Sequence, residues 1–219
     1  DNKEISAVLR TLRRSTQMGA AVNSFENKLS KYFSKKYGLM VNSGSSALIL
    51  ALKVMNLKNG SEIITPCLNF GTAVSSIMLS NCVPVLVDCK VDTLQIDEDK
   101  IEEKITKKTK AILVPNLIGN VPDWKKIKSL ANKYNLKVLE DSADTLGAKI
   151  NNKPTGIYSD ISITSFYGSH VISCAGNGGI FLTNNKNYYT RAKVLRSWGR
   201  MSTLIKDSEN INKRLGIKL

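Results

Sequence analysis

The sequence predicts an α/β protein in three layers, with a mostly parallel β-sheet between two layers of helices. Two observations carry this prediction. Short apolar runs rich in β-branched residues alternate along the chain with longer stretches of helical periodicity. The connections between them are short, and this arrangement places parallel strands side by side with helices on both faces of the sheet. A chain of 219 residues is long enough to bury one large core of this kind.

The elements are predicted in the following order. A helix with aromatic and leucine side chains on one face begins at Asn23 or Ser24, both good N-caps. A short strand at 39–42 and an apolar helix at 44–55 come next. Four β-branched strands then alternate with helices: the strands are EIITP, VPVLVD, KAILVP and LKVLED, and the helices span 72–80, 97–105 and 123–134. Two last strands, ISITSF and GIFLTN, enclose a loop that carries His170, the only histidine of the chain.

The chain shows no internal repeat and no linker, so we expect one α/β domain at 38–200. Residues 1–37 are predicted to form N-terminal helices that pack on the edge of this core. Residues 201–219 follow the last helical and extended patterns and lie outside the predicted domain.

The net charge of +14 invites a nucleic-acid hypothesis, because basic side chains neutralise phosphates. Most of the basic residues, however, are lysines spaced along predicted helix surfaces, whereas planar phosphate or base recognition favours arginine. We therefore expect a solvated lysine-rich face and no nucleic-acid partner, with some attraction for small anionic substrates.

The cysteines and the lengths of the apolar runs indicate in which cellular compartment the protein is expected. The four cysteines, at 67, 82, 89 and 174, form no C-x-x-C pair and lie within or beside apolar runs, which predicts buried free thiols in a reducing compartment. No signal peptide opens the sequence, and no apolar run approaches the ~20 residues that span a bilayer. The expectation is a cytoplasmic protein with no membrane partner.

Ligands of parallel α/β sheets bind at the carboxyl ends of the strands, and three segments place polar residues there. In VNSGSSAL, a strand runs through Gly44, Ser45 and Ser46 into a helix, so that backbone amides, hydroxyls and the helix dipole face one anionic group such as a phosphate. The alternative is that Ser45 or Ser46 only caps the helix. The segment matches neither nucleotide-binding glycine motif.

In VLEDSADTLG, a second predicted strand ends in carboxylates. Glu140, Asp141 and Asp144 could hold magnesium, but Asp88 is the one acidic residue at the end of another predicted strand, so no metal site is predicted. A carboxylate at a buried strand end can instead pair with a protonated ring nitrogen. The third segment places Ser165 and His170 where the ISITSF strand ends. A single histidine is most often an ordinary packed residue.

Taken together, four motifs resemble those of the DegT/DnrJ/EryC1/StrS sugar aminotransferase family. They are N-S-G-S-S-A-L, P-x-L-N-F-G-T-A-V, V-L-E-D-S-A-D-T-L-G and S-F-Y-G-S-H-V-I-S, and the resemblance runs from about Phe25 to Arg200. It implies the type I, or aspartate aminotransferase, fold and pyridoxal 5'-phosphate (PLP) or pyridoxamine 5'-phosphate (PMP) as cofactor. Ordinary members carry a lysine, which binds the cofactor as a Schiff base, at the position that His170 occupies.

The histidine, together with RSWGR at 196–200, resembles one branch of the family, the NDP-4-keto-6-deoxyhexose 3-dehydratases. Some of these enzymes hold an iron-sulfur cluster, and others have none and recharge the cofactor with glutamate. The positions of the four cluster cysteines are occupied here by Ala143, Met201, Thr203 and Ile211, none of which binds iron. The resemblance therefore implies no iron-sulfur cluster, glutamate as amino donor and a non-covalent cofactor.

The resemblance also implies a role for each candidate residue. Those for the cofactor are Gly44, Ser45, Ser46 and Ser165 at the phosphate, Phe70 on the ring face, Asp141 at the ring nitrogen and Asp144 near the phenolic oxygen. His170 would act as acid and base in the loss of the C3 hydroxyl, because imidazole titrates near the working pH.

Two alternatives stay open at this point. One is a sugar-nucleotide aminotransferase that uses another lysine, for which Lys149 is the nearest candidate, and the other is a non-catalytic binding or regulatory protein that keeps the cofactor fold. Relatives continue into a smaller C-terminal domain, so 201–219 is expected to be the start of such a region, cut short. The resemblance implies a homodimer. The nucleotide and the hexose cannot be read from these residues.

Overall fold

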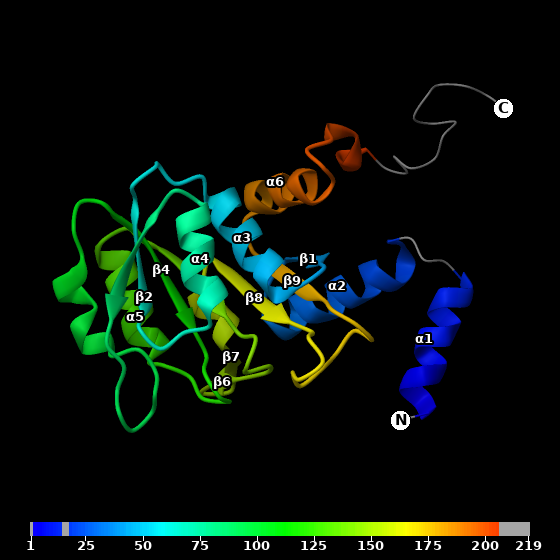
Figure 1. Ribbon diagram of the computed structural model, residues 1–219, viewed down its shortest axis with the longest axis horizontal. Helices are drawn as coiled ribbons and strands as arrows, with labels where there is room; N and C mark the ends of the chain where they lie inside the picture. The colour runs from blue at the N-terminus through cyan, green and yellow to red at the C-terminus, as the bar shows by residue number, and fades with distance from the viewer. Residues whose placement is uncertain (1, 15–17, 206–219) are drawn as a thin grey trace.

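The computed structural model describes residues 2–14 and 18–205, and its centre is a seven-stranded sheet (Figure 1). The strand order is β1-β9-β8-β5-β4-β2-β3, and β9 alone runs against its neighbours. The predicted mostly parallel α/β sheet is therefore confirmed. The strands are β1 (Tyr37–Val41), β2 (Glu62–Pro66), β3 (Val83–Val87), β4 (Thr109–Pro115), β5 (Lys137–Asp141), β8 (Ile161–Ser165) and β9 (Gly179–Thr183).

Helices cover both faces of the sheet, as the alternating pattern predicts. One face packs against α3 (Gly44–Met55), α4 (Gly71–Leu79) and α6 (Lys186–Arg196) through a large apolar cluster. The other face packs against α5 (Trp124–Lys133), whose Trp124 and Ile127 are fully buried, and near β9 against α2 (Ala20–Tyr32). Burying strands on both faces accounts for their continuous apolar runs.

The N-terminal helices differ from each other in their packing. Helix α2 begins at Ala20, three residues before Asn23, the earlier of the two predicted caps. Its Leu29 belongs to the same apolar cluster as Phe166 and the β9 residues Ile180 and Leu182. Helix α1 (Asn2–Arg14) has no buried residue. The structure thus places α2, and not α1, against the core. The predicted domain boundaries at residues 37 and 200 stay predictions. Of the predicted C-terminal region, 206–219 lies outside the described residues.

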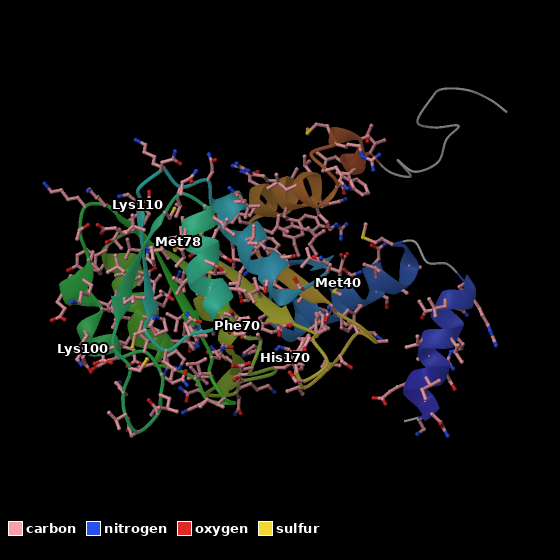
Figure 2. All side chains as sticks on the ribbon, viewed as in Figure 1. Met40, Phe70, Met78, Lys100, Lys110 and His170 are labelled. Atoms are coloured by element: carbon pink, nitrogen blue, oxygen red, sulfur yellow. The ribbon has the colours of Figure 1, made fainter. Side chains whose placement is uncertain are left out.

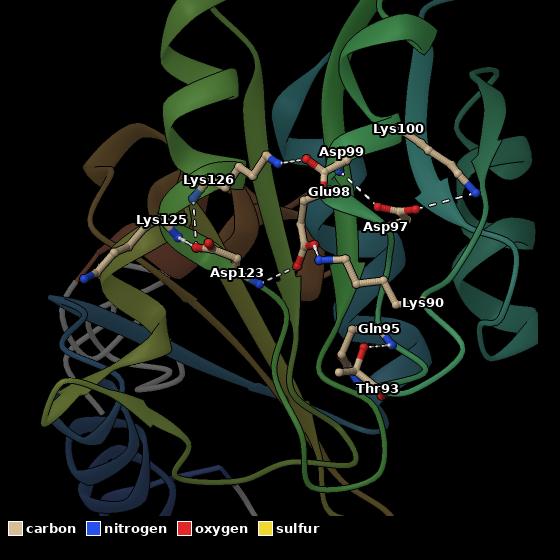
Figure 3. A network of polar contacts seen from close by, with 10 residues as sticks. All are labelled: Lys90, Thr93, Gln95, Asp97, Glu98, Asp99, Lys100, Asp123, Lys125 and Lys126. Atoms are coloured by element: carbon tan, nitrogen blue, oxygen red, sulfur yellow. Dashed lines mark hydrogen bonds and ion pairs between the residues drawn. The ribbon is translucent and has the colours of Figure 1, made fainter.

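The predicted helix at 97–105 is wrong. Two 3₁₀ turns stand in its place, η1 (Glu98–Lys100) and η2 (Glu102–Lys104). The reason is Glu98, which turns inward to a buried position, accepts a hydrogen bond from the amide of Asp123 and pairs with Lys90 (Figure 3). A continuous helix over this segment would lose that buried pairing.

Lysines of the predicted solvated face form ion pairs with neighbouring carboxylates. Lys126 pairs with Asp99, and Lys100 lies 3.5 Å from Asp97 (Figure 3). Exposed pairs of this kind contribute little stability, because water and salt screen the two charges. These ion pairs nevertheless neutralise part of the positive charge of the chain.

The remaining elements are short. They are β6 (Lys149–Ile150) and β7 (Lys153–Pro154), which form a separate two-stranded sheet, and the 3₁₀ turns η3 (Thr155–Tyr158) and η4 (Met201–Leu204). The cysteines are free, as predicted, but only Cys82 is buried, whereas Cys67 and Cys174 are exposed because they lie in loops beyond strand ends. None of the described helices has the length and apolar character needed to cross a membrane.

Candidate active site

A cavity of about 410 Å³ opens at the carboxyl edge of the sheet. Five parallel strands, β1, β2, β4, β5 and β8, each end at this cavity and place a polar or aromatic residue beside it. Its walls are Ser43, Gly44, Ser45, Leu48, Asn69, Phe70, Thr72, Pro115, Asn116, Leu117, Asp141, Ala143, Asp144, Ile163, Ser165, Tyr167, Ser169, His170, Asn177 and Gly178. All the predicted site residues except Ser46 are among them.

The turn between β1 and α3 forms one corner of the cavity. Ser43 is the N-cap of α3, because its hydroxyl accepts the amide of Ser46 at 3.1 Å and donates to the Ser46 hydroxyl at 3.0 Å. Neither Ser45 nor Ser46 is therefore the cap. The amides of Gly44 and Ser45 belong to the first helical turn, which has no intrahelical acceptors, and both residues line the cavity.

Glycine at position 44 allows this corner to close on β8. A Cβ atom there would lie 2.8 Å from the Cβ of Ser165, nearer than side chains tolerate. The bare glycine thus brings the hydroxyl of Ser165 against the start of α3. Two amides, the Ser165 hydroxyl and a helix N-terminus in one corner form a donor set that can bind an anionic group.

Asp141 ends β5 on the cavity wall and is 5% exposed. Burial raises the pKa of this carboxyl to about 7, and the neighbouring carboxylates of Asp144 and Glu140 add to the rise, while a hydrogen bond from the amide of Ala143 opposes it. A buried carboxylate that lacks a cation is costly to charge. The position is therefore suited to a ligand that brings a positive charge to the wall.

The loop after β2 presents an aromatic ring. Phe70 is 70% exposed and lines the cavity, as His170 does; both side chains are labelled in Figure 2. Asn69 fixes this loop, since its side chain accepts the amide of Phe70 and donates to the hydroxyl of Thr65. The buried hydroxyl oxygen of Thr72, also on the wall, has no hydrogen-bond partner among the described residues.

His170 lies in the loop between β8 and β9. Its amide donates to the carbonyl of Tyr167 at 3.0 Å, and the two rings meet edge to face with centroids 6.1 Å apart. The imidazole Nδ1 lies 3.8 Å from a carboxylate oxygen of Asp144. The side chain is 20% exposed and lines the cavity, so it is neither a packed core residue nor a surface residue.

A buried polar network supports the wall from behind. Asn116 donates to Glu140 and Ser142, and Glu140 also accepts from Ser162 at 2.6 Å. The network ends at Lys35, whose ammonium donates to the carbonyl of Ser159 at 2.5 Å. Burial lowers the pKa of Lys35 to about 8, and Glu140 acts against this shift.

Lysines do not line the cavity in the described part of the chain. Lys35 is committed to the supporting network, and Lys149, the lysine named by the aminotransferase alternative, is exposed on β6. Sequence reasoning missed several wall residues, among them Ser43, Asn69, Thr72 and Asn116. Their position in the sequence could have identified them, because each lies at, or a few residues beyond, the end of a predicted strand.

The donor set matches a ligand with an anionic group, a flat ring and a cationic ring atom. The corner at Gly44 could hold such an anion, the surface beside Phe70 such a ring, and Asp141 such a cation. The buried carboxyl of Asp141, which lines the cavity, is the observation that favours a cationic ligand atom. At about 410 Å³, the cavity lies in the size range of small-molecule and cofactor sites.

Comparison with known proteins yields a family and several relatives. A model of the DegT/DnrJ/EryC1/StrS aminotransferase family matches residues 1–219. GDP-perosamine synthase of Escherichia coli O157:H7 is 37% identical over 181 residues, which are 83% of the chain and 50% of the relative. GDP-4-keto-6-deoxy-D-mannose 3-dehydratase of Yersinia pseudotuberculosis is 32% identical over 206 residues, 91% of the chain and 52% of the relative. The chain thus spans about half the length of these curated relatives.

Solved structures agree with the sequence comparison. A structure of GDP-4-keto-6-deoxymannose-3-dehydratase with PLP and glutamate trapped as a geminal diamine superposes with a TM-score of 0.87 and 29% identity, over 100% of the chain and 59% of the other. The predicted PLP-dependent aminotransferase fold is therefore confirmed. Relatives of both kinds, transaminase and dehydratase, match the chain.

Proposed function

Because the chain belongs to the DegT/DnrJ/EryC1/StrS aminotransferase family, we propose that it binds PLP or PMP without a covalent bond and removes the C3 hydroxyl of an NDP-4-keto-6-deoxyhexose. One observation carries the choice of a dehydratase. The loop position that holds the cofactor-binding lysine in ordinary members is His170, it lines the cavity, and the described wall contains no lysine.

The corner at α3 is proposed to hold the cofactor phosphate. The amides of Gly44 and Ser45 and the hydroxyl of Ser165 face it, and the helix N-terminus adds favourable potential. Ser46 contributes indirectly, since its amide and hydroxyl are bound to Ser43 and fix the first turn of α3.

The ring is proposed to lie between Phe70 and the sheet edge, with its nitrogen at Asp141. A protonated ring nitrogen would relieve the cost of charging this buried carboxyl, whose pKa is raised to about 7 without a partner. In return, the carboxylate keeps the nitrogen protonated. When bound, the cofactor supplies an electron sink, and this is the chemistry that makes loss of a hydroxyl beside a ketone carbon feasible. Asp144 lies on the wall where the family places a polar residue near the phenolic oxygen.

His170 is proposed to move the protons. Its imidazole takes a proton beside the reacting centre and returns one to the departing C3 oxygen, which leaves as water. A positioned acid-base group of this kind contributes about 10²–10⁴ in rate. A lysine at this position would form a covalent bond to the cofactor carbonyl, whereas an imidazole makes no such bond.

Glutamate is proposed as the source of electrons, because the related structure holds it together with PLP. Atoms and electrons then balance: the sugar loses one oxygen, glutamate is oxidised to 2-oxoglutarate, and its nitrogen leaves as ammonia. The proposal includes a homodimer in the cytoplasm, as the resemblance implies, and no iron-sulfur cluster.

A sugar-nucleotide aminotransferase is the second candidate, because GDP-perosamine synthase is 37% identical over 83% of the chain. The two candidates differ in how the cofactor is held. Borohydride fixes a cofactor that is bound through a lysine Schiff base and leaves a free cofactor removable by dialysis.

The test is therefore reduction of the PLP-loaded chain followed by mass spectrometry of the denatured protein. We expect the unmodified mass for the wild type and a phosphopyridoxyl adduct for His170→Lys. A phosphopyridoxyl adduct on a lysine of the wild type would contradict the proposal and favour the aminotransferase.

A further inference from the structure

We propose that Asp144 is a positioning residue for His170. The carboxylate of Asp144 holds the imidazole proton on Nδ1 and leaves the lone pair on Nε2 for the ligand in the cavity. The catalytic part of this inference rests on the proposed function. The pairing itself rests on the geometry of the two side chains.

The two groups face each other across the cavity wall. The Nδ1 atom of His170 and a carboxylate oxygen of Asp144 are 3.8 Å apart, and the two side chains are 20% and 48% exposed. This separation lies within ion-pair range when the imidazole is protonated and is longer than a hydrogen bond. Catalytic hydrogen bonds are often long without ligand and shorten when the site is filled.

The backbone around both residues is fixed, so the approach is built into the fold. The strands β5 and β8 are adjacent and parallel, with Asp141 opposite Ile163, and the loops that follow them carry Asp144 and His170. On the β5 side, the hydroxyl of Thr145 donates to the carbonyl of Asn116 at 2.9 Å.

The β8 side is held by its own backbone bonds. The amide of His170 donates to the carbonyl of Tyr167 at 3.0 Å, and the amide of Cys174 donates to the carbonyl of Phe166 at 3.2 Å. The rings of Tyr167 and His170 also meet edge to face, with their centroids 6.1 Å apart.

Imidazole chemistry gives the pairing its consequence. The tautomer of a neutral histidine is set by the hydrogen bond that one ring nitrogen makes. An ionised carboxylate only accepts hydrogen bonds, so it selects the form with the proton on Nδ1. The Nε2 atom, on the other side of the ring, then carries the lone pair that a general base requires. A free imidazole prefers the opposite tautomer.

The chain offers an unusually direct test, because His170 is its only histidine. A sample labelled with ¹⁵N-histidine and purified without a polyhistidine tag gives one pair of ring-nitrogen resonances. At a pH where the ring is neutral, we expect Nδ1 to carry the proton in the wild type and Nε2 to carry it in Asp144→Asn. Asp144→Glu should restore the wild-type pattern at least in part.

A matched control removes a carboxylate elsewhere. Asp92 is exposed in the loop between β3 and η1, and Asp92→Asn should leave the ring resonances of His170 unchanged. The pairing is contradicted if wild type and Asp144→Asn show the same tautomer, or if Asp92→Asn shifts the pattern as much as Asp144→Asn does.

Activity completes the test. For Asp144→Asn we expect kcat to fall at least about tenfold, as for other partners that orient a functional histidine, and Asp144→Glu should restore part of this loss. A loss of PMP affinity with an unchanged tautomer would show that Asp144 serves the cofactor alone and would overturn the inference. If the wild type forms no dehydrated product, the proposed function fails, while the ¹⁵N spectra still decide the pairing.

Discussion

Two ionisable side chains on the cavity wall lie in different surroundings. Asp141 is buried at the end of β5, and this burial raises its pKa to about 7. His170 is partly exposed and lies beside the carboxylate of Asp144. The Asp141 carboxyl is therefore suited to a cationic ligand atom, and the His170 imidazole is suited to proton transfer. This division of work between a ring-nitrogen partner and an acid-base group is what the proposed reaction needs.

Asp141 gives a stability prediction with a definite sign. Its pKa is about 7 in the folded chain and near 3.8 in the unfolded chain, so between these values the folded state binds the extra proton. The free energy of unfolding without cofactor should therefore fall as pH rises from about 4 to about 7. Asp141→Asn removes this loss, and at pH 8 it should be more stable than the wild type by a few kcal/mol at most, since each pKa unit corresponds to ~1.4 kcal/mol.

Urea unfolding at pH 4 and pH 8 measures this effect. Contributions from all other carboxylates cancel in the difference between the two proteins. The difference should be small at pH 4 and favour Asp141→Asn at pH 8, and saturating PMP should reverse the order at pH 8. A wild type that is as stable as the variant at pH 8 without cofactor would refute the assignment of a costly buried charge.

At the scale of elements, glycines set how closely β9 approaches the turn between β1 and α3. A Cβ on Gly179 would lie 2.3 Å from the carbonyl carbon and oxygen of Ser43, and these backbone atoms cannot move independently of the cap. The start of β9 therefore holds the corner that we assign to the cofactor phosphate. Packing here acts on binding as well as on stability.

Gly179→Ala should lower the free energy of unfolding by about 1–3 kcal/mol, the usual cost of forced overpacking. It should also weaken PMP binding, because the amides of α3 would shift away from the phosphate. Gly71→Ala, where a Cβ meets no atom within 4 Å, is the matched control and should leave both quantities nearly unchanged. Equal effects of the two substitutions in chemical unfolding and PMP titration would argue against a close approach at β9.

The elements differ in how far local sequence determines them. The helix at 44–55 and the strands around it are predicted within one or two residues, because their apolar residues follow one period and caps or turns end them. The segment 97–105 has a helical pattern but forms two 3₁₀ turns, since Glu98 is drawn inward by partners distant in sequence, Lys90 and the amide of Asp123. Such tertiary pairings are not visible in local periodicity.

The site is predictable for a related reason. Parallel strands deliver their carboxyl ends to one edge, so motifs at separate strand ends, such as Gly44, Asp141 and His170, are expected to meet, and all three line one cavity. Asn116 and Lys35 were not predicted. Their positions depend on the buried network through Glu140, in which the bonds of Asn116 to Glu140 and of Lys35 to Ser159 join residues far apart in the chain.

At the scale of the whole molecule, we propose that this transaminase fold, with histidine in place of lysine, releases nitrogen instead of keeping it in the sugar. The two candidate reactions consume the same glutamate and form the same 2-oxoglutarate. They differ in the fate of one atom. In dehydration, the amino nitrogen ends as ammonia, whereas in transamination it stays bonded to the hexose.

The most direct measurement follows this nitrogen. The chain is incubated with PLP, ¹⁵N-glutamate and a panel of NDP-4-keto-6-deoxyhexoses, and the sugar product and ammonium are analysed by mass spectrometry and NMR. For dehydration we expect ¹⁵N-ammonium in step with 2-oxoglutarate and a sugar nucleotide that lacks one oxygen and contains no ¹⁵N, with both signals lost in His170→Asn. A sugar nucleotide that carries ¹⁵N, formed without free ammonium, would contradict dehydration.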